Sequence, residues 1–176
     1  MPDGHAADFK PASRTTITAA NLRDMSYIAA NMREADRREI FAVIDEPPAV
    51  IAYMLHEASP GFAWVAHYDG QPVCAFGVST MLPGLGSGWA YGTREMPNVM
   101  RAVTAFCRRT ASRRAAATFR RIEVRTAVGH DLSARWLGSL GFRLEGVAVD
   151  YGTNGLDFAI YGATRSSAAR LIKDRI

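Results

Sequence analysis

The segment from residue 121 to residue 142 constrains the fold of this chain more than any other part of the sequence. Residues 121–128 alternate between two faces, which is the period of a β-strand. The residues expected on one face are Ile122, Val124, Thr126 and Val128, and those on the other are Arg121, Glu123, Arg125 and Ala127. Gly129 then breaks the alternation, so the strand is expected to end there.

A short helix is expected directly after this strand. Asp131 belongs to the residue types that cap helix N-termini. The stripe expected to be buried is Leu132, Trp136 and Leu140, which recur every four residues. Gly141 can end the helix, and Phe142 can then fold back on its last turn. A strand, a short helix and a returning strand form a βαβ unit, around which the rest of the chain can be built.

Length and composition favour one folded domain. The chain has 176 residues, of which 48% are hydrophobic and 22% are charged, as in ordinary globular proteins. We expect residues 1–14 to form a polar tail and residues 15–176 to form a single domain. No apolar run approaches the ~20 residues that cross a bilayer, and the N-terminus lacks the layout of a signal peptide. We therefore predict a cytoplasmic protein that is not secreted and has no membrane partner.

The cysteine and histidine residues show no pattern of metal ligands. Cys74 and Cys107 are the only cysteines, and each lies within an apolar run. We expect both to be reduced thiols in the core. The four histidines, His5, His56, His67 and His130, show no ligand spacing. The sequence therefore predicts no metal site.

Arginine supplies nearly all of the positive charge in a chain of net charge +4. Six arginines crowd one segment: Arg108, Arg109, Arg113, Arg114, Arg120 and Arg121. Such a cluster could contact nucleic acid or an acidic partner. Aromatic residues that could stack on bases are not interleaved with it. The favoured interpretation is a solvated helix end, and nucleic acid is not the expected partner.

The rest of the chain alternates between helical and strand periods. We expect strands at residues 15–18, 62–68, 73–82, 89–92, 144–151 and 156–161. We expect helices that begin at Asn21, at the capping-box pair Asp36 and Glu39, at Val50 and near Pro97, and a last one over residues 166–176. Asp69-Gly70 and Asn154-Gly155 predict hairpins, and residues 83–88 a glycine-rich turn. This order predicts an α/β (α+β) chain, a mixed sheet with helices on both faces.

The order of elements, with Gly-Phe closing the last helix before a hairpin, resembles the GNAT superfamily of N-acetyltransferases over residues 15–164. Within it, the chain most resembles GNAT-like proteins of short-tailed phages, which are related to an internal virion protein. The strings that carry this resemblance are Met32–Ile40, Asp69–Val73, Phe76-Gly77, Trp89, Trp136-Leu137 and Gly141-Phe142. The resemblance implies a mostly antiparallel sheet and a location in the host cytoplasm or the virion.

The GNAT resemblance implies acetyl-CoA as cofactor, with its pyrophosphate on bare amides at the start of a helix. The matching segment is residues 93–98, and the contacts it implies come from Arg94, Met96, Asn98 and Val99. This segment departs from the family pattern, because it has no glycine, carries Glu95, and loses one amide donor to Pro97.

The resemblance also implies an acid for the leaving thiolate and a base for the attacking amine. Leu137 stands where the family has a tyrosine, so His130 and Tyr91 are the candidate acids. Glu123 is the candidate base, with His67 as a second choice. The alternative interpretation of Glu123 is an ion pair with Arg121 or Arg125 on the same strand face.

The sequence leaves two functions open, and with them whether the chain is an enzyme. The first is an acetyl-CoA-dependent N-acyltransferase that acts on a small amine or a protein. The second is a non-catalytic virion assembly protein that works through contacts with itself or with other virion proteins. A nucleic-acid binder that uses the arginine cluster is a remoter third.

Overall fold

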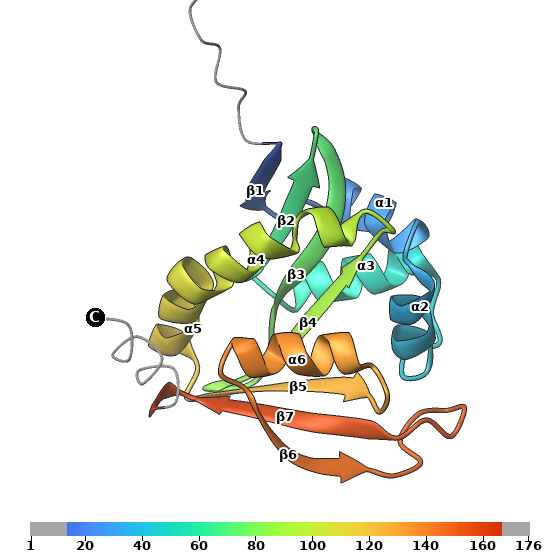
Figure 1. Ribbon diagram of the computed structural model, residues 1–176, viewed down its shortest axis with the longest axis vertical. Coiled ribbons are helices and arrows are strands. Elements are labelled where there is room, and N and C mark those ends of the chain that lie inside the picture. The colour runs from blue at the N-terminus through green and yellow to red at the C-terminus, as the bar shows by residue number, and fades with distance from the viewer. Residues whose placement is uncertain (1–13, 167–176) are drawn as a thin grey trace, which may run out of the picture.

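The computed structural model describes residues 14–166, which form one seven-stranded sheet with helices on both faces (Figure 1). The predicted tail, apart from Arg14, and the predicted helix over residues 166–176, apart from Ser166, lie outside the described residues. The strands are β1 (Thr15–Ala19), β2 (Ala63–Tyr68), β3 (Gln71–Leu82), β4 (Leu85–Gly92), β5 (Arg121–Ala127), β6 (Arg143–Ala148) and β7 (Phe158–Thr164). Their order is β1-β2-β3-β4-β5-β7-β6, and every neighbouring pair is antiparallel except the parallel pair β4 and β5. The predicted fold class is confirmed.

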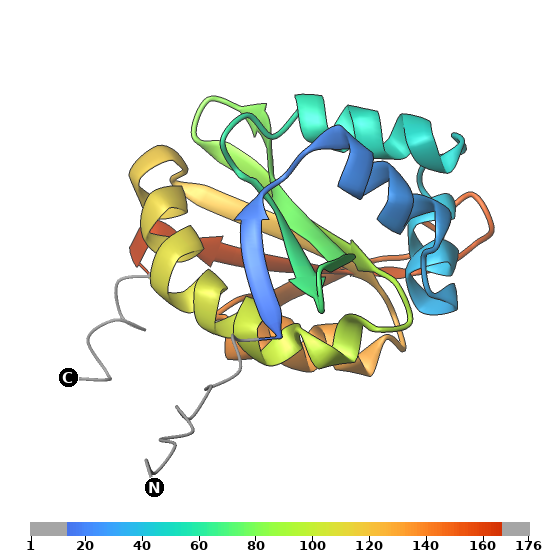
Figure 2. The ribbon, with the colours of Figure 1, turned by 90° about the horizontal axis from the view of Figure 1, so that it is seen from above.

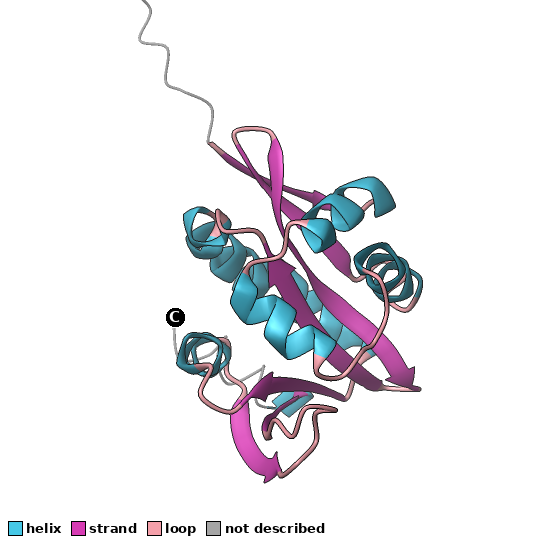
Figure 3. Ribbon diagram, turned by 90° about the vertical axis from the view of Figure 1, so that its right-hand side faces the viewer, coloured by secondary structure: helices cyan, strands magenta, loops and turns pink. Residues whose placement is uncertain are grey.

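The helices form two groups on opposite faces of the sheet (Figures 2 and 3). They are α1 (Leu22–Ala30), α2 (Glu34–Phe41), α3 (Pro48–Glu57), the 3₁₀ turn η1 (Met96–Asn98), α4 (Met100–Phe106), the π-helical turn η2 (Cys107–Ala111), α5 (Ser112–Thr118) and α6 (Asp131–Ser139). α4, η2 and α5 follow one another without a break and cover one face together with α6. α1 and α3 cover the other face.

Alternation along β2 and β3 divides the core into two clusters, one on each face. Val65 and Ala75 pack with Met25 and Ile28 of α1. Trp64, the neighbour of Val65, packs on the opposite face in a cluster whose other buried members are Ala66, Val73, Cys74, Phe76, Met96, Val99 and Val103. The buried thiol of Cys74 and the partly buried thiol of Cys107 are both free, as predicted.

Residues 121–142 continue into β6 and fold as strand, helix and returning strand. Gly141 has φ of 87°, and the Phe142 amide donates to the Leu137 carbonyl at 3.1 Å, which closes the helix end as predicted. Two details of the prediction are wrong. His130 rather than Asp131 is the N-cap residue, and Leu132 is 66% exposed, whereas Leu137 is buried. The helix is only nine residues long, so its buried face is set by the few contacts around Trp136 and Leu137.

Two other boundaries also differ from the prediction. α2 begins at Glu34, so Asp36 and Glu39 lie inside the helix instead of forming a capping box. β4 begins at Leu85, so Gly86 and Gly88 belong to a strand and not to a turn. Glycine is needed there because a Cβ at Gly86 would lie 2.5 Å from Val78, and one at Gly88 would lie 2.7 Å from Val124. Close packing, rather than a turn, explains these glycines.

Candidate functional site

The parallel strands β4 and β5 separate part of the way along their length. They pair only from Leu85 to Ser87 on one strand and from Arg121 to Glu123 on the other. β4 continues to Gly92 paired with β3, and β5 continues to Ala127 paired with β7. From Gly88 onward, the edge of β4 that faces β5 therefore has no strand partner. Such an edge offers backbone N–H and C=O groups to a ligand.

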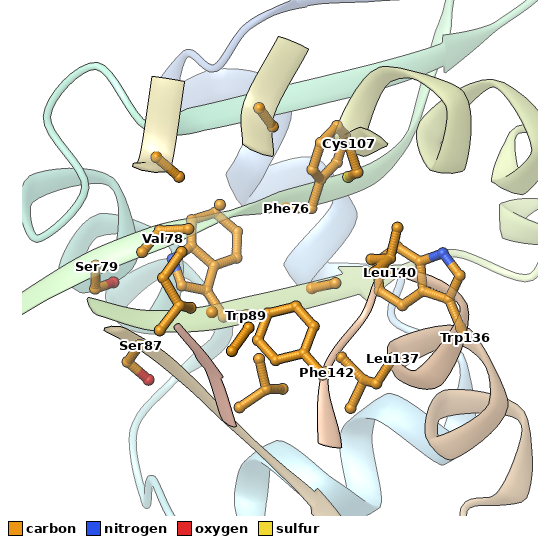
Figure 4. A pocket seen from close by; sticks show the side chains of 18 of the residues that line it. Phe76, Val78, Ser79, Ser87, Trp89, Cys107, Trp136, Leu137, Leu140 and Phe142 are labelled. Carbon is orange, nitrogen blue, oxygen red and sulfur yellow. The ribbon is translucent and has the colours of Figure 1, made fainter. Parts of the chain in front are cut away.

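A cavity of about 780 Å³ lies at this gap. Its walls include β4 and β5, with α5 and α6 on one face of the sheet and α2 on the other. Figure 4 shows that the side chains around it are mostly apolar, among them Phe76, Trp89, Leu137, Leu140 and Phe142. A volume of this size is within the range of small-molecule and cofactor sites.

Glu39 of α2 places a carboxylate on the wall of the cavity, at the C-terminal end of β5. Its Oε2 accepts hydrogen bonds from the Thr126 hydroxyl at 3.0 Å and from the Ala127 amide at 3.1 Å. The same oxygen lies 2.9 Å from Nδ1 of His130. Oε1 has no hydrogen-bond partner among residues 14–166. One oxygen therefore fixes the carboxylate, and the other is available to a ligand.

His130 is the one predicted catalytic residue that the structure brings into contact with Glu39. It is the N-cap residue of α6, and the Ser133 hydroxyl lies 3.1 Å from its Nδ1. Its side chain is 15% exposed and that of Glu39 is 20% exposed. A partly buried imidazole beside a carboxylate is suited to move or hold a proton.

Tyr91 also borders the cavity, but its hydroxyl is engaged elsewhere. The residue is fully buried, its ring stacks on Trp89, and its hydroxyl donates to the Met25 carbonyl at 3.2 Å. Burial raises the pKa of Tyr91 well above its ordinary value, so the phenol stays protonated at neutral pH. The structure does not bring this hydroxyl to Glu39 or His130.

Glu123 lies between two arginines on one face of β5. Its carboxylate oxygens are 2.9 Å from Nε of Arg121 and 3.5 Å from the guanidinium of Arg125. Arg121 also pairs with Glu145 of β6, and this pairing holds the pKa of the Glu145 carboxyl below its usual range. Glu123 does not line the cavity. Its contacts are those of an ion pair within the strand, which the sequence predicts as the alternative to a catalytic role for Glu123. His67, the second-choice base, instead lies 3.1 Å from Asp24 of α1.

The segment predicted to hold a pyrophosphate forms a tight turn instead. The amides of Met96, Asn98 and Val99 donate to backbone carbonyls of this same turn at 3.0 to 3.1 Å, and Pro97 has no amide hydrogen. Met96 and Val99 are buried in the core. Residues 96–99 thus offer no bare amide to an anion.

The exposed side chains of this turn differ in what they can still bind. Nδ2 of Asn98 donates to the Glu95 carboxylate at 2.6 Å. Arg94 is exposed and could reach a phosphate group. None of the four predicted cofactor contacts lines the cavity.

Hydrogen bonds from two side chains, Trp136 and Arg108, tie α6 to the helix on its flank. Nε1 of Trp136 donates to the Thr104 hydroxyl of α4 at 3.0 Å. The Arg108 guanidinium donates to the Ser139 carbonyl at 2.8 Å. These contacts hold α6 against α4 and η2 over the cavity.

Sequence reasoning missed Glu39 as a site residue and Asp36 as a buried one. A signal was present, because Asp36, Glu39, Ile40 and Val43 follow the i, i+3, i+4, i+7 spacing of one helix face. Two carboxylates within an otherwise apolar stripe are costly unless they are paired or used. Because Asp36 and Glu39 were interpreted as a capping box at a helix start, they were not considered as residues of one buried helix face.

The thiols are expected to react slowly in the folded protein. Burial raises the pKa of Cys107 to about 12, and that of Cys74 beyond its usual range. Because the thiolate is the reactive form, labelling at pH 8 should be at least about a hundredfold slower than in the unfolded chain. Labelling with a chromogenic disulfide, with and without urea, measures the ratio. Comparable rates in the two states would contradict the raised pKa values of the two thiols.

The described residues show neither a metal-binding cluster nor a membrane-spanning helix. Over residues 14–166, no group of three or more histidine, cysteine or acidic side chains is placed to hold a metal ion. No helix in this part of the chain has the length and apolar character needed to span a bilayer.

Known proteins resemble this chain in structure and not in sequence. No protein-family model matches the sequence, and neither does any curated protein. A GNAT-superfamily phosphinothricin acetyltransferase from Sinorhizobium meliloti, solved with acetyl-CoA, is 20% identical with a TM-score of 0.68. The similarity covers 86% of this chain and 88% of that one.

Two further solved structures have the same TM-score of 0.68. The ribosomal-protein-alanine N-acetyltransferase from Brucella melitensis is 17% identical, and the match covers 85% of this chain and 99% of that one. The yncA protein from Salmonella typhimurium, solved with its cofactor acetyl-CoA, is 15% identical, with 87% and 95% covered. These similarities show that the chain has the GNAT acetyltransferase fold.

Proposed function

We propose that this chain is an N-acyltransferase of the GNAT type, which moves an acyl group from a thioester to an amine. The observation that carries the proposal is the gap between β4 and β5. There a cavity of about 780 Å³ meets an unpaired strand edge and the Glu39 carboxylate. A donor arm, an acceptor and a base can therefore occupy one cavity.

Acetyl-CoA is the proposed donor, since two of the solved structures with this fold hold it. The backbone of β4 from Gly88 to Tyr91 is suited to hydrogen-bond the amides of a pantetheine arm, as a partner strand would. The turn at residues 96–99 gives the pyrophosphate no bare amide. We therefore propose that the arm supplies most of the binding free energy, with Arg94 as the contact to the phosphates.

The bound thioester would supply an activated acyl group, and side chains at the gap between β4 and β5 would accept and donate the protons. Oε1 of Glu39 is free to take the proton that the amine loses on attack. His130 lines a smaller pocket next to Glu39 and not the cavity itself, so its proposed role is to orient the Glu39 carboxylate. Glu39, once it holds the proton of the amine, is the proposed proton donor to the leaving thiolate. The Tyr91 hydroxyl is less suited to that role, because it is bonded to the Met25 carbonyl.

The acceptor is proposed to be a small amine or a protein amine. One solved structure with this fold is that of a ribosomal-protein-alanine N-acetyltransferase, so the fold admits a protein substrate. Val43, Ile44 and Tyr151 line the same cavity as Glu39. These side chains would contact the acceptor.

Calorimetric titration with acetyl-CoA and with acetyl-pantetheine tests the proposal. We expect saturable binding of both, and an affinity difference of no more than about tenfold, because a single exposed ion pair contributes only about 0–1 kcal/mol. Arg94→Gln should remove most of that difference. An absence of binding by either compound to the folded protein would remove the acyltransferase proposal.

The second candidate is a non-catalytic protein that acts through protein contacts, for which the sequence resemblance suggests a phage particle. The closed turn at residues 96–99 favours it. The edge strand β6 favours it too, because Leu144 and Val147 are 58% and 50% exposed. Concentration-dependent self-association, measured by sedimentation, together with no response to acetyl-CoA, is the expected result for this function. A monomer that binds acetyl-CoA would count against it.

A further inference from the structure

One end of the cavity is rich in arginine. The cavity is lined by six arginines and one carboxylate, Glu39, among the described residues. Four of the arginines belong to η2 (Arg108, Arg109), to α5 (Arg113) and to the residue after β7 (Arg165), and α5 lies beside the end of β7 on the left of Figure 1. We call these four the arginine mouth. No carboxylate lies beside them in the cavity wall within residues 14–166.

The arginine mouth differs from the other arginines at this end of the molecule. Arg121 pairs with Glu123 and Glu145, and Arg114 lies over the Phe62 ring. In contrast, Arg109, Arg113 and Arg165 are exposed, and their side chains have no ion-pair or hydrogen-bond partner in the part of the chain that the structure describes. Their charge is therefore available to a ligand.

Arg108 is held in position before any ligand arrives. Its Nε and one terminal nitrogen donate to the Ser139 carbonyl at 3.2 and 2.8 Å. A guanidinium that is already oriented loses less side-chain entropy when it binds an anion. The remaining donors of Arg108 stay available on the cavity wall.

We infer that the arginine mouth binds a phosphate-bearing group with more than one negative charge, such as a diphosphate. Guanidinium groups match the oxygen geometry of phosphate, and several on one wall favour a group of high charge. The site lies on η2, α5 and the end of β7, apart from the turn at residues 93–99 that the GNAT resemblance implies for phosphates. The inference is independent of the proposed acyl transfer.

Titration with inorganic pyrophosphate tests the inference. The wild-type protein should bind it saturably at one site. The double variant Arg109→Gln/Arg113→Gln should bind at least about tenfold more weakly, since it loses two charged contacts at once. Both side chains are exposed, and glutamine has nearly the same helix propensity as arginine, so the fold should be retained.

Two control variants distinguish the arginine mouth from diffuse attraction and from binding at the turn. Arg101→Gln/Arg135→Gln removes the same charge from exposed positions on α4 and α6 outside the cavity, and should change the affinity by less than about twofold. Arg94 is proposed to contact phosphates only when the acyl arm holds them beside it, so Arg94→Gln should change the affinity for free pyrophosphate by less than about twofold. Equal weakening by Arg101→Gln/Arg135→Gln would reveal diffuse attraction, and loss through Arg94→Gln would move the site to the turn at residues 93–99. Either result, or no pyrophosphate binding, would overturn the inference.

Discussion

Replacing Glu39 with glutamine is expected to lower the rate of acyl transfer by at least about a hundredfold, the usual contribution of a general base. Glutamine keeps an oxygen that can accept the bonds from Thr126 and Ala127, which are 3.0 and 3.1 Å long in the wild type. It cannot take a proton from the amine. The loss should therefore fall on kcat, while acetyl-CoA affinity and stability stay close to wild type.

The assay for this variant follows thiol release from acetyl-CoA in the presence of a panel of amines. Glu34→Gln is the matched control, because it makes the same change at an exposed position of the same helix. It should keep wild-type activity. Equal rates for Glu39→Gln and wild type would show that the carboxylate does not act as the base.

Replacing Asp36 with alanine is expected to cost about 3–5 kcal/mol of unfolding free energy, the range for breaking a buried ion pair. The Asp36 side chain is 6% exposed, and its carboxylate lies 2.8 Å from the Arg33 guanidinium. It also accepts a hydrogen bond of 2.8 Å from the Gly92 amide at the end of β4. Alanine would leave the Arg33 charge and the Gly92 amide without this partner.

Urea denaturation measures this cost, with Glu34→Ala as the exposed control that should stay within about 0.5 kcal/mol of wild type. The double variant Arg33→Met/Asp36→Leu should regain much of the loss, since it removes both charges. A single Asp36→Ala variant as stable as the control would show that α2 is not anchored to β4 through this carboxylate.

Local patterns predicted the elements whose contacts are close in the sequence. Alternation over residues 121–128 predicted β5. Gly141-Phe142 predicted the end of α6, where the Phe142 amide donates a hydrogen bond to the carbonyl of Leu137, five residues earlier in the chain. Asp69 and Gly70 have φ of 49° and 78°, the left-handed pair that their hairpin requires. In each case the residue type itself restricts the backbone.

Contacts between distant segments could not be predicted in the same way. Glu39 meets Ala127 across 88 residues, and Asp36 meets Gly92 across 56. Both carboxylates satisfied a local capping pattern, and only the packing of α2 against the ends of β4 and β5 shows their partners. The amide bonds of the turn at residues 96–99 are likewise a property of the folded backbone.

The gap between β4 and β5 is the basis of the proposed function, and amide NMR with added acetyl-CoA tests it most directly. We expect the largest shift changes at Gly88–Tyr91 and at Val124–Thr126, the facing segments that line the cavity beyond the last paired residues. Glu39→Gln should show the same pattern, because the acyl arm binds without the base. Shift changes confined to other surfaces, or no change at saturating acetyl-CoA, would contradict the account.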